Sequence, residues 1–184
     1  MVSTAFLSDM ELYYERPCEK RIPKEEAVYD FLDTVGVAHV RVDHEPAMNM
    51  EVCDSIYGVL GSSICKNLFL CNRQETQFYL LMMPGHKTFR TKDLSAQIGS
   101  SRLSFASAEW MEKLLGLTPG SVSVFGLLND SEHRVHLLID EELLASQSLG
   151  AHPCINTSSL RISISDLTEK IIPALDYTYT VVRL

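Results

Sequence analysis

Two apolar runs separated by a short polar connection constrain the fold more than any other feature of this sequence. Residues 66–71 and 77–83 each have the length and composition of a buried strand, and the five residues between them are all polar. A connection of this length and polarity is typical of a β-hairpin. The longest uninterrupted apolar stretch, residues 78–83, is far shorter than the roughly 20 residues that span a bilayer. The sequence therefore predicts an antiparallel strand pair and excludes a membrane span.

The rest of the chain alternates between helical and strand-like patterns. Helices are predicted where apolar residues recur at helical spacing up to a glycine or proline, and Ser107 is a candidate N-cap. Residues 122–128 and 134–139 are predicted to form a second hairpin. The predicted helices are 24–35, 49–60, 92–98, 108–115 and 166–172, and the remaining strands are 37–43, 160–164 and 177–184. Strands outnumber what a strict β-α-β alternation gives, so we expect an α/β (α+β) fold: a mixed, largely antiparallel sheet curled toward a barrel, with helices packed outside.

The chain has the size and composition of one domain. Its 184 residues are 46% hydrophobic and 22% charged, and no linker or repeat divides them. Residues 1–20 lack clear periodicity, so we expect an N-terminal extension that docks on a single domain of residues 21–184. The first ten residues carry Asp9 and no Lys or Arg ahead of an apolar segment, unlike a signal peptide. A cytoplasmic location is therefore expected.

Charge and motif content narrow the function classes. A net charge of −8 argues against a protein that grips a long nucleic acid non-specifically, so any RNA partner must be held locally. The five cysteines are odd in number and never spaced as C-x-x-C, which indicates reduced packing residues. The six histidines show no metal-ligand spacing, and the common nucleotide, phosphate, serine-hydrolase and zinc motifs are absent. Neither a metal nor a cofactor is predicted.

Two short segments are candidate functional sites, although each also has a plain structural interpretation, and a third is interpreted as structural. Lys66 begins an apolar strand, where a lysine can also simply keep its ammonium group in water. Gly150-Ala151-His152-Pro153 is a candidate binding turn, but glycine and proline also occur in turns that bind nothing. Phe125-Gly126-Leu127, taken alone, is interpreted as a core strand with a bulge glycine.

Taken in order, several segments add up to a family resemblance that covers residues 23–184. They are Lys66-Asn67-Leu68-Phe69-Leu70, Met83-Pro84-Gly85, Ser101-Arg102-Leu103-Ser104-Phe105-Ala106, Gly116-Leu117-Thr118-Pro119-Gly120-Ser121-Val122, Phe125-Gly126-Leu127, and Gly150-Ala151-His152-Pro153 with Asn156-Thr157. Their succession and spacing resemble the YbaK/prolyl-tRNA synthetase-associated editing family. Within it they are most similar to the ProX or PrdX branch, the free-standing alanyl-tRNA(Pro) deacylases.

The resemblance implies a function. Prolyl-tRNA synthetase mistakenly charges the smaller alanine, and a hydrophobic pocket cannot exclude a smaller substrate, because a missing methylene is worth only about 1–3 kcal/mol. Members of the ProX-like branch act in trans and hydrolyse the ester between alanine and the terminal ribose of the tRNA. The implied partner is the acceptor end of mischarged tRNA(Pro), and prolyl-tRNA synthetase is a second candidate partner.

The resemblance also implies a site. Lys66 and His152 are the implied catalytic residues, with Lys66 at the ester end of the pocket and His152 beside the late turn. An aminoacyl ester is already activated, so positioning can supply much of the rate without a nucleophilic Ser or Cys. The implied substrate-binding residues are Asn67, Gly150, Ala151, Pro153, Phe125, Gly126, Leu127 and Met48.

Two alternatives stay open at the level of sequence. The first is a Cys-tRNA(Pro) deacylase of the YbaK branch, and the second is a non-catalytic protein that binds an amino acid or a tRNA end as a regulator or synthetase partner. The segment from His44 departs from the family's more usual His-Pro-Ala stretch by the inserted Glu45, at the expected floor of the pocket. The sequence specifies no oligomeric state.

Overall fold

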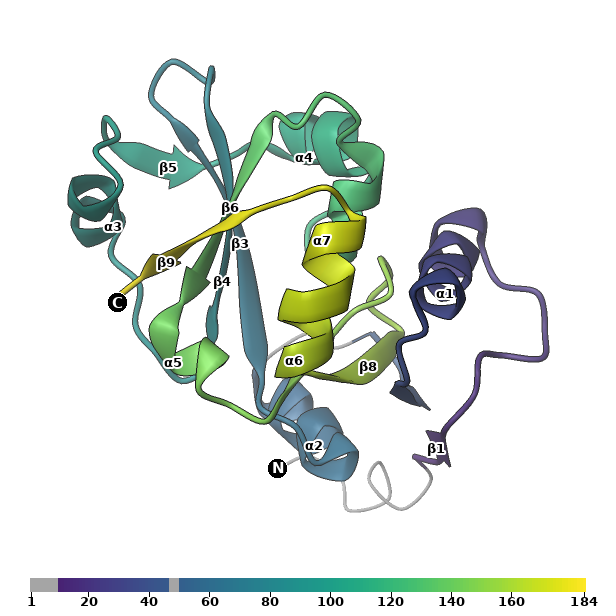
Figure 1. Cartoon of the computed structure of the whole chain (residues 1–184). Helices are drawn as coiled ribbons and strands as arrows, with labels where there is room; N and C mark the ends of the chain where they lie inside the picture. The colour runs from purple at the N-terminus through teal and green to yellow at the C-terminus, as the bar shows by residue number, and fades with distance from the viewer. Residues whose placement is uncertain (1–9, 47–49) are drawn as a thin grey trace.

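The computed structural model describes residues 10–46 and 50–184, and it builds them around two β-sheets covered by helices (Figure 1). The strands are β1 (Leu12–Tyr13), β2 (Val40–Asp43), β3 (Cys65–Asn72), β4 (Phe78–Pro84), β5 (Leu103–Phe105), β6 (Val135–Asp140), β7 (Ser148–Ala151), β8 (Ser158–Ser163) and β9 (Tyr179–Val182). The helical segments are α1 (Pro23–Val35), α2 (Met50–Leu60), α3 (Thr91–Gln97), α4 (Ala108–Leu115), η2 (Val124–Asn129), α5 (Glu141–Leu144), α6 (Ile164–Asp166), η3 (Leu167–Ile171) and α7 (Ile172–Ala174).

The larger sheet has the strand order β5-β3-β4-β6-β9. Its centre is the β3–β4 hairpin, whose antiparallel register runs from Cys65 opposite Pro84 to Cys71 opposite Phe78. This hairpin confirms the prediction from the two apolar runs. On its other side β4 pairs in parallel with β6, and β6 pairs in parallel with β9. The predicted pairing of residues 122–128 with residues 134–139 is therefore wrong.

The smaller sheet has the order β1-β2-β8-β7 and is antiparallel throughout. In the described residues, an isolated bridge between Ser63 and Leu149 lies between this sheet and the approach to β3. The mixed, largely antiparallel α/β character of the prediction is confirmed. The predicted curl into a barrel is not confirmed. The described strands form two separate sheets, because one bridge does not make a continuous ladder.

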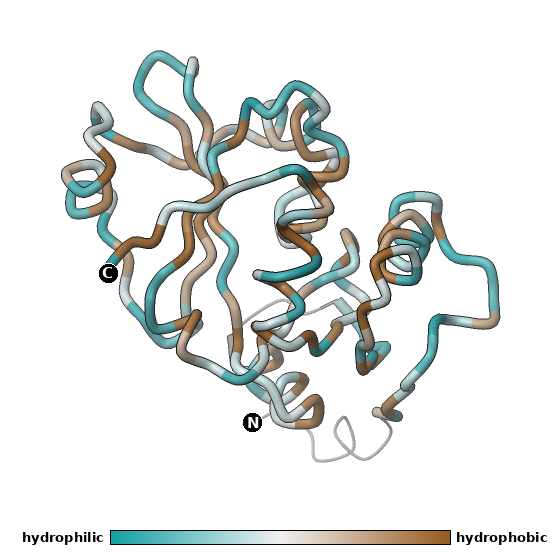
Figure 2. The backbone as a smooth tube through the Cα atoms, in the orientation of Figure 1, coloured by the Kyte–Doolittle hydropathy of each residue, from teal (hydrophilic) through white to brown (hydrophobic). Residues whose placement is uncertain are grey.

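Both faces of β4 are buried, which explains why residues 78–83 are apolar without interruption. Phe78, Leu80 and Met82 belong to the main core with residues of both sheets and of the C-terminal helical segment. The alternate residues face a second cluster that includes Leu94 of α3 and Val182 of β9. Figure 2 shows the same distribution, with hydrophobic stretches concentrated in the central strands and hydrophilic ones in the outer loops.

Local capping explains which helix boundaries the sequence predicts well. The Ser107 hydroxyl accepts a hydrogen bond from the Trp110 N–H at the start of α4, and Gly116 ends that helix with a φ of 64°. A positive φ at this position favours glycine, because it has no Cβ. Among the described residues, no helix combines the length and the apolar character that a membrane crossing requires.

Two helical segments differ from the sequence prediction. Residues 124–129 form a 3-10 helix instead of a strand, capped by the Ser123 hydroxyl, which accepts from the Phe125 N–H. A short apolar run cannot by itself distinguish a strand from a buried helical turn. In the C-terminal segment, Pro173 does not stop the helix, which continues to Ala174. The preceding turn is π-helical, and the usual i→i−4 bonding is already interrupted there, which accommodates a residue without an N–H.

The residues before α1 lie on the smaller sheet and on that helix. Strand β1 pairs with β2 through Leu12 and Tyr13. The guanidinium of Arg16 forms ion pairs with the carboxylates of Glu26 and Asp30 at 2.7 and 2.9 Å.

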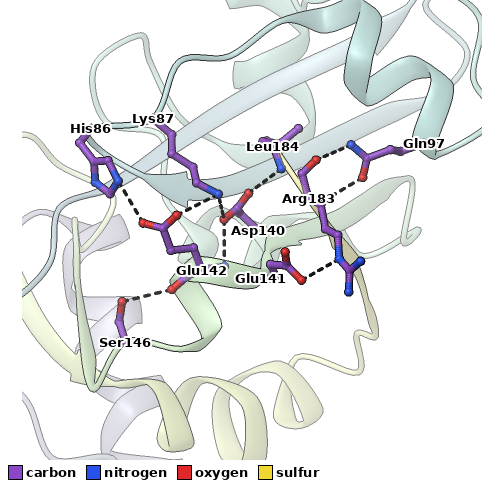
Figure 3. A network of polar contacts seen from close by, with 9 residues as sticks. All are labelled: His86, Lys87, Gln97, Asp140, Glu141, Glu142, Ser146, Arg183 and Leu184. Atoms are coloured by element: carbon purple, nitrogen blue, oxygen red, sulfur yellow. Dashed lines mark hydrogen bonds and ion pairs between the residues drawn. The ribbon is translucent and has the colours of Figure 1, made fainter.

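A buried carboxylate joins the end of β6 to the loop after β4 and to the C-terminus (Figure 3). Asp140 is fully buried. Its oxygens accept from the Lys87 Nζ at 2.8 Å, from the Glu142 N–H at 3.0 Å and from the Leu184 N–H at 3.1 Å. These bonds hold three separate chain segments at one point.

We expect Asp140→Ala to lower the free energy of unfolding by about 3–5 kcal/mol, because it leaves the Lys87 ammonium without its buried partner. The matched control is Glu141→Ala, which removes a half-exposed carboxylate bound to Arg183 and should cost less than about 1 kcal/mol. Urea unfolding of both variants measures the difference. Equal losses in the two variants would show that Asp140 is no more than a surface ion pair.

Candidate active site

Lys66 is the second residue of β3, where the sheet begins. It lies opposite Met83 of β4, and the alternation of a strand places it on the outer face with Leu68. Its half-buried side chain donates from Nζ to the backbone carbonyl of Lys87 at 3.2 Å. Asn67, the next residue, lies on the opposite face, where its Oδ1 is 3.9 Å from the Cys65 Sγ. Lys66 and Asn67, which were both predicted to contact the substrate, thus lie on opposite faces of the sheet.

Two hollows of the surface meet at Lys66. The larger has a volume of about 770 Å³ and lies between β3, the loop that follows β4, and β5. The smaller, of about 450 Å³, is lined by Asp54, Ile64, Lys66, Gly85 and His86. Lys66 therefore offers an ammonium group to concave surface on both sides, which suits a role in holding an anionic or ester group.

Lys66 donates to the backbone carbonyl of Lys87. The side chain of Lys87 is itself bound from two directions (Figure 3). The Lys87 ammonium is bound by Asp140 at 2.8 Å and by Glu142 at 3.1 Å. The imidazole of the neighbouring His86 is 3.0 Å from the Glu142 carboxylate. Because its side chain is anchored in this way, the Lys87 carbonyl is a fixed acceptor for Lys66.

A second polar group lies at the ends of the smaller sheet's strands. His44 follows β2, His152 follows β7, and Ser159 is in β8. The His44 Nε2 is 2.9 Å from the Ser159 Oγ, which lies 3.4 Å from the His152 Nδ1. The two imidazole centroids are 6.3 Å apart. One serine hydroxyl thus lies between two histidine rings.

Burial and hydrogen bonding define the protonation of these rings. Burial lowers the pKa of His44 and of His152 below the ordinary imidazole value, so both are neutral at pH 7. The Nδ1 atoms face the carbonyls of Glu45 and Ser158 at 2.8 and 3.0 Å. A carbonyl only accepts, so both protons are on Nδ1. The His152 Nε2 therefore keeps its lone pair and can act as an acceptor or a base.

Tyr57 of α2 packs directly on Gly150 and extends this group. A Cβ at Gly150 would lie 1.9 Å from the Tyr57 Cε1, so the ring requires glycine there. Burial raises the pKa of Tyr57, and its hydroxyl is hydrogen-bonded to Ser159. The Gly150 N–H donates to the Ser63 carbonyl at 3.0 Å. Both the space beside the Gly150 Cα and the Gly150 N–H are therefore occupied by contacts within the protein.

The segment Gly150-Ala151-His152-Pro153 is not one turn. Gly150 and Ala151 end strand β7, which pairs with β8, and the loop begins at His152. Ala151 and Pro153 are buried. The prediction of a turn is wrong because the glycine makes room for Tyr57 rather than reversing the chain.

The predicted pocket walls lie in the main core. Phe125, Gly126 and Leu127 of η2 are buried, and a Cβ on Gly126 would lie 2.7 Å from the Leu117 Cδ1. Met48 lies outside the described residues. The structure therefore gives the three described residues a packing environment.

Lys66 and His152 belong to two separate groups. In the described part of the chain, no hydrogen bond, ion pair or ring contact joins them directly. Both groups adjoin the Ser63–Leu149 bridge, because Lys66 is three residues beyond Ser63 and His152 three residues beyond Leu149. No sequence motif identifies the other members of the two groups, which are Tyr57, Ser159, Lys87 and Asp140.

Two buried thiols and the arrangement of possible metal ligands can also be assessed in the described region. Burial raises the pKa of Cys65 and of Cys154 to about 12, so both are protonated at neutral pH and are poor nucleophiles. Within residues 10–46 and 50–184, no three His, Cys, Asp or Glu side chains are grouped so that they could hold a metal ion.

Comparisons with known proteins agree on one family. The model of the aminoacyl-tRNA editing domain matches residues 44–170. The prolyl-tRNA editing protein ProX of Acetoanaerobium sticklandii is 34% identical over 159 residues, which cover 86% of this chain and 96% of that protein. Prolyl-tRNA synthetase associated domain-containing protein 1 of Danio rerio is 24% identical over 140 residues, or 75% of this chain and 76% of that protein.

A solved structure shows the same fold. The crystal structure of a candidate trans-editing enzyme for prolyl tRNA synthetase superposes with a TM-score of 0.67. It is 19% identical, and the match covers 90% of this chain and 98% of that one.

The half-buried rings of His44 and His152 should make the stability pH-dependent. Their folded-state pKa values lie below the unfolded value of about 6.5, so the unfolded state binds more protons below that pH. Their contribution is complete above pH 6.5 and is lost as the pH falls toward the folded-state values, with a slope of up to about 1.4 kcal/mol per pH unit for each histidine.

Urea unfolding between pH 7.5 and 5.5 measures this slope. His152→Gln should flatten this slope relative to the wild type, because it removes one of the two rings whose pKa is lowered on folding. An unchanged slope in His152→Gln would contradict the lowered pKa assigned to His152.

Proposed function

We propose the following function for this chain, which belongs to the aminoacyl-tRNA editing domain family: it is a trans-acting deacylase that removes alanine from mischarged tRNA(Pro). The observation that carries the proposal is the 34% identity to a prolyl-tRNA editing protein over 96% of that protein's length. A separate hydrolytic site is the physical answer to a substrate that is too small to be excluded by the synthetic site. The family resemblance predicted from sequence is confirmed.

The proposed reaction is hydrolysis of an activated ester. Water attacks the alanyl carbonyl carbon, the bond to the ribose oxygen breaks, and that oxygen takes up a proton, which gives free alanine and tRNA. Holding the ester and the water in line supplies much of the rate. The positive charge of Lys66 stabilises the negative charge that develops, and it is the group we assign to this role.

The remaining predicted site residues support this reaction in different ways. We assign the His152 Nε2, with its available lone pair, to orienting the water or the amino group of alanine. Gly150 and Ala151 place His152, because the contact of Gly150 with Tyr57 fixes the end of β7. Pro153 begins the buried loop after it. Asn67, Phe125, Gly126 and Leu127 shape the interior from the core side.

The proposed partner is the acceptor end of tRNA(Pro). An acidic chain of net charge −8 is poorly suited to hold the body of a tRNA, so we propose that only the end is bound. We further propose that prolyl-tRNA synthetase, in the cytoplasm, is the source of the mischarged molecule and presents it.

Substrate discrimination tests the proposal directly. The purified protein should release alanine from Ala-tRNA(Pro) and leave Pro-tRNA(Pro) intact, as measured by deacylation of labelled amino acid. Preferential release from Cys-tRNA(Pro) would identify the alternative deacylase, and hydrolysis of none of the three would refute an editing function.

The role of Lys66 has its own test. Lys66→Ala should slow single-turnover deacylation about 100- to 1000-fold, the effect of losing one charge-stabilising donor. The melting temperature should hardly change, because Lys66 makes one hydrogen bond to a carbonyl, worth about 1 kcal/mol. Lys66→Arg should restore part of the rate, since its shape differs.

Lys113→Ala is the matched control for lost charge. The Lys113 ammonium lies over the Trp110 ring, 4.6 Å from its centroid, on α4, and its removal should leave the rate unchanged. A wild-type rate in Lys66→Ala would assign this lysine to packing alone.

A further inference from the structure

The larger hollow beside Lys66 has a composition that the chemistry at the ester does not explain. It lies on the outer face of the five-stranded sheet, between β3, the loop of residues 86–91, and the edge strand β5. Its lining includes Lys66, Lys87, Arg90 and Lys92, and no Asp or Glu among the described residues. Positive charge thus gathers in one place on a chain whose net charge is −8.

The four cations are not equivalent. Lys87 is neutralised by Asp140 and Glu142. The exposed pair of Arg90 with Asp93, at 2.8 Å, is of the surface type that contributes little and can be exchanged for another anion. In the described structure no carboxylate forms an ion pair with Lys66 or Lys92. Lys66, Lys92 and Arg90 are therefore available to an anionic ligand.

Two aromatic rings lie beside these cations. Phe105 on β5 is 63% exposed, although a phenylalanine of this exposure adds little to the core. Its ring meets the half-buried Phe89 edge-on, with centroids 6.2 Å apart. Phe89 thus contacts the Phe105 ring, and more than half of the Phe105 side chain stays exposed to solvent.

We propose that this hollow binds the single-stranded 3′ end of an RNA, with a base stacked on Phe105 and phosphates at Lys92 and Arg90. Cations beside an exposed aromatic ring are the combination that holds single strands, because phosphates need charge and unpaired bases need a face to stack on. An acidic peptide would use the charges but not the exposed ring.

The position of Lys66 connects the larger hollow, called the groove below, to the proposed reaction. Lys66 and His86 line both the larger and the smaller hollow. An RNA end in the groove therefore reaches Lys66 with its terminal ribose, while the preceding nucleotides lie toward Phe105. The inference rests on the proposed deacylase function and adds how that substrate is held.

Direct binding tests the groove without the ester. The probe is a fluorescein-labelled single-stranded oligoribonucleotide of about eight nucleotides ending in CCA, titrated with the protein at several salt concentrations. We expect Phe105→Ala to raise the Kd about tenfold, as expected for the loss of one stacked base. Lys92→Glu should raise the Kd and reduce the salt dependence by about 0.7 in slope for the lost phosphate contact.

Two control variants change one exposed hydrophobic side chain and one lysine elsewhere on the surface. Leu128→Ala removes another exposed hydrophobic side chain, and Lys113→Glu reverses a charge on α4; both should bind as the wild type does. Melting curves of all four variants establish that they are folded. With Ala-tRNA(Pro), Phe105→Ala and Lys92→Glu should raise KM, and the controls should not.

The outcomes separate this inference from the proposed function. Unchanged RNA affinity in Phe105→Ala and Lys92→Glu overturns the groove even when the wild type deacylates Ala-tRNA(Pro). Equal binding of a poly-glutamate peptide, or no RNA binding by the wild type, overturns it as well. RNA binding that these two variants weaken supports the groove even when no charged tRNA is hydrolysed, in which case the deacylase proposal alone fails.

Discussion

The ion pair between Lys87 and the buried Asp140 fixes the part of the molecule where the chemistry is proposed. A buried charge is costly unless it is paired and hydrogen-bonded, and Asp140 has a lysine and two backbone N–H groups as partners. These contacts tie together β6, the loop after β4 and the C-terminus. The Lys87 carbonyl in that loop holds the Lys66 ammonium. The buried ion pair thus helps to hold the Lys66 ammonium in place at the surface of the larger hollow.

The two faces of β3 carry different parts of the candidate site. The period of a strand sends Lys66 outward and Asn67 inward. The outward face presents positive charge and the exposed ring of Phe105, whereas the interior and the smaller sheet hold the neutral rings of His44 and His152 around Ser159. A chain of net negative charge can in this way offer positive charge at one place and keep a half-buried, neutral polar group elsewhere.

The sequence predicted those features that short-range chemistry controls. Ser107 and Gly116 bound α4 as predicted because each acts on its own helix end. The β3–β4 hairpin followed from its polar connection. The strand predicted over residues 122–128 is wrong, since residues 124–129 form a 3-10 helix, and the parallel pairing of β4 with β6 was not predicted. Both features depend on the tertiary packing around a short apolar run.

The candidate site shows the same limit. Lys66 and His152 came from a family pattern, but Tyr57, Ser159 and Asp140 are separated from them by long stretches of chain and carry no motif. The most direct measurement is a double-mutant cycle on single-turnover deacylation of Ala-tRNA(Pro), with Lys66→Ala, Asp140→Asn and the double variant at a temperature where all are folded. If the buried pair acts through Lys66, Asp140→Asn lowers the deacylation rate when Lys66 is present and does not lower it further in the Lys66→Ala background. Additive losses in the double variant would contradict that connection.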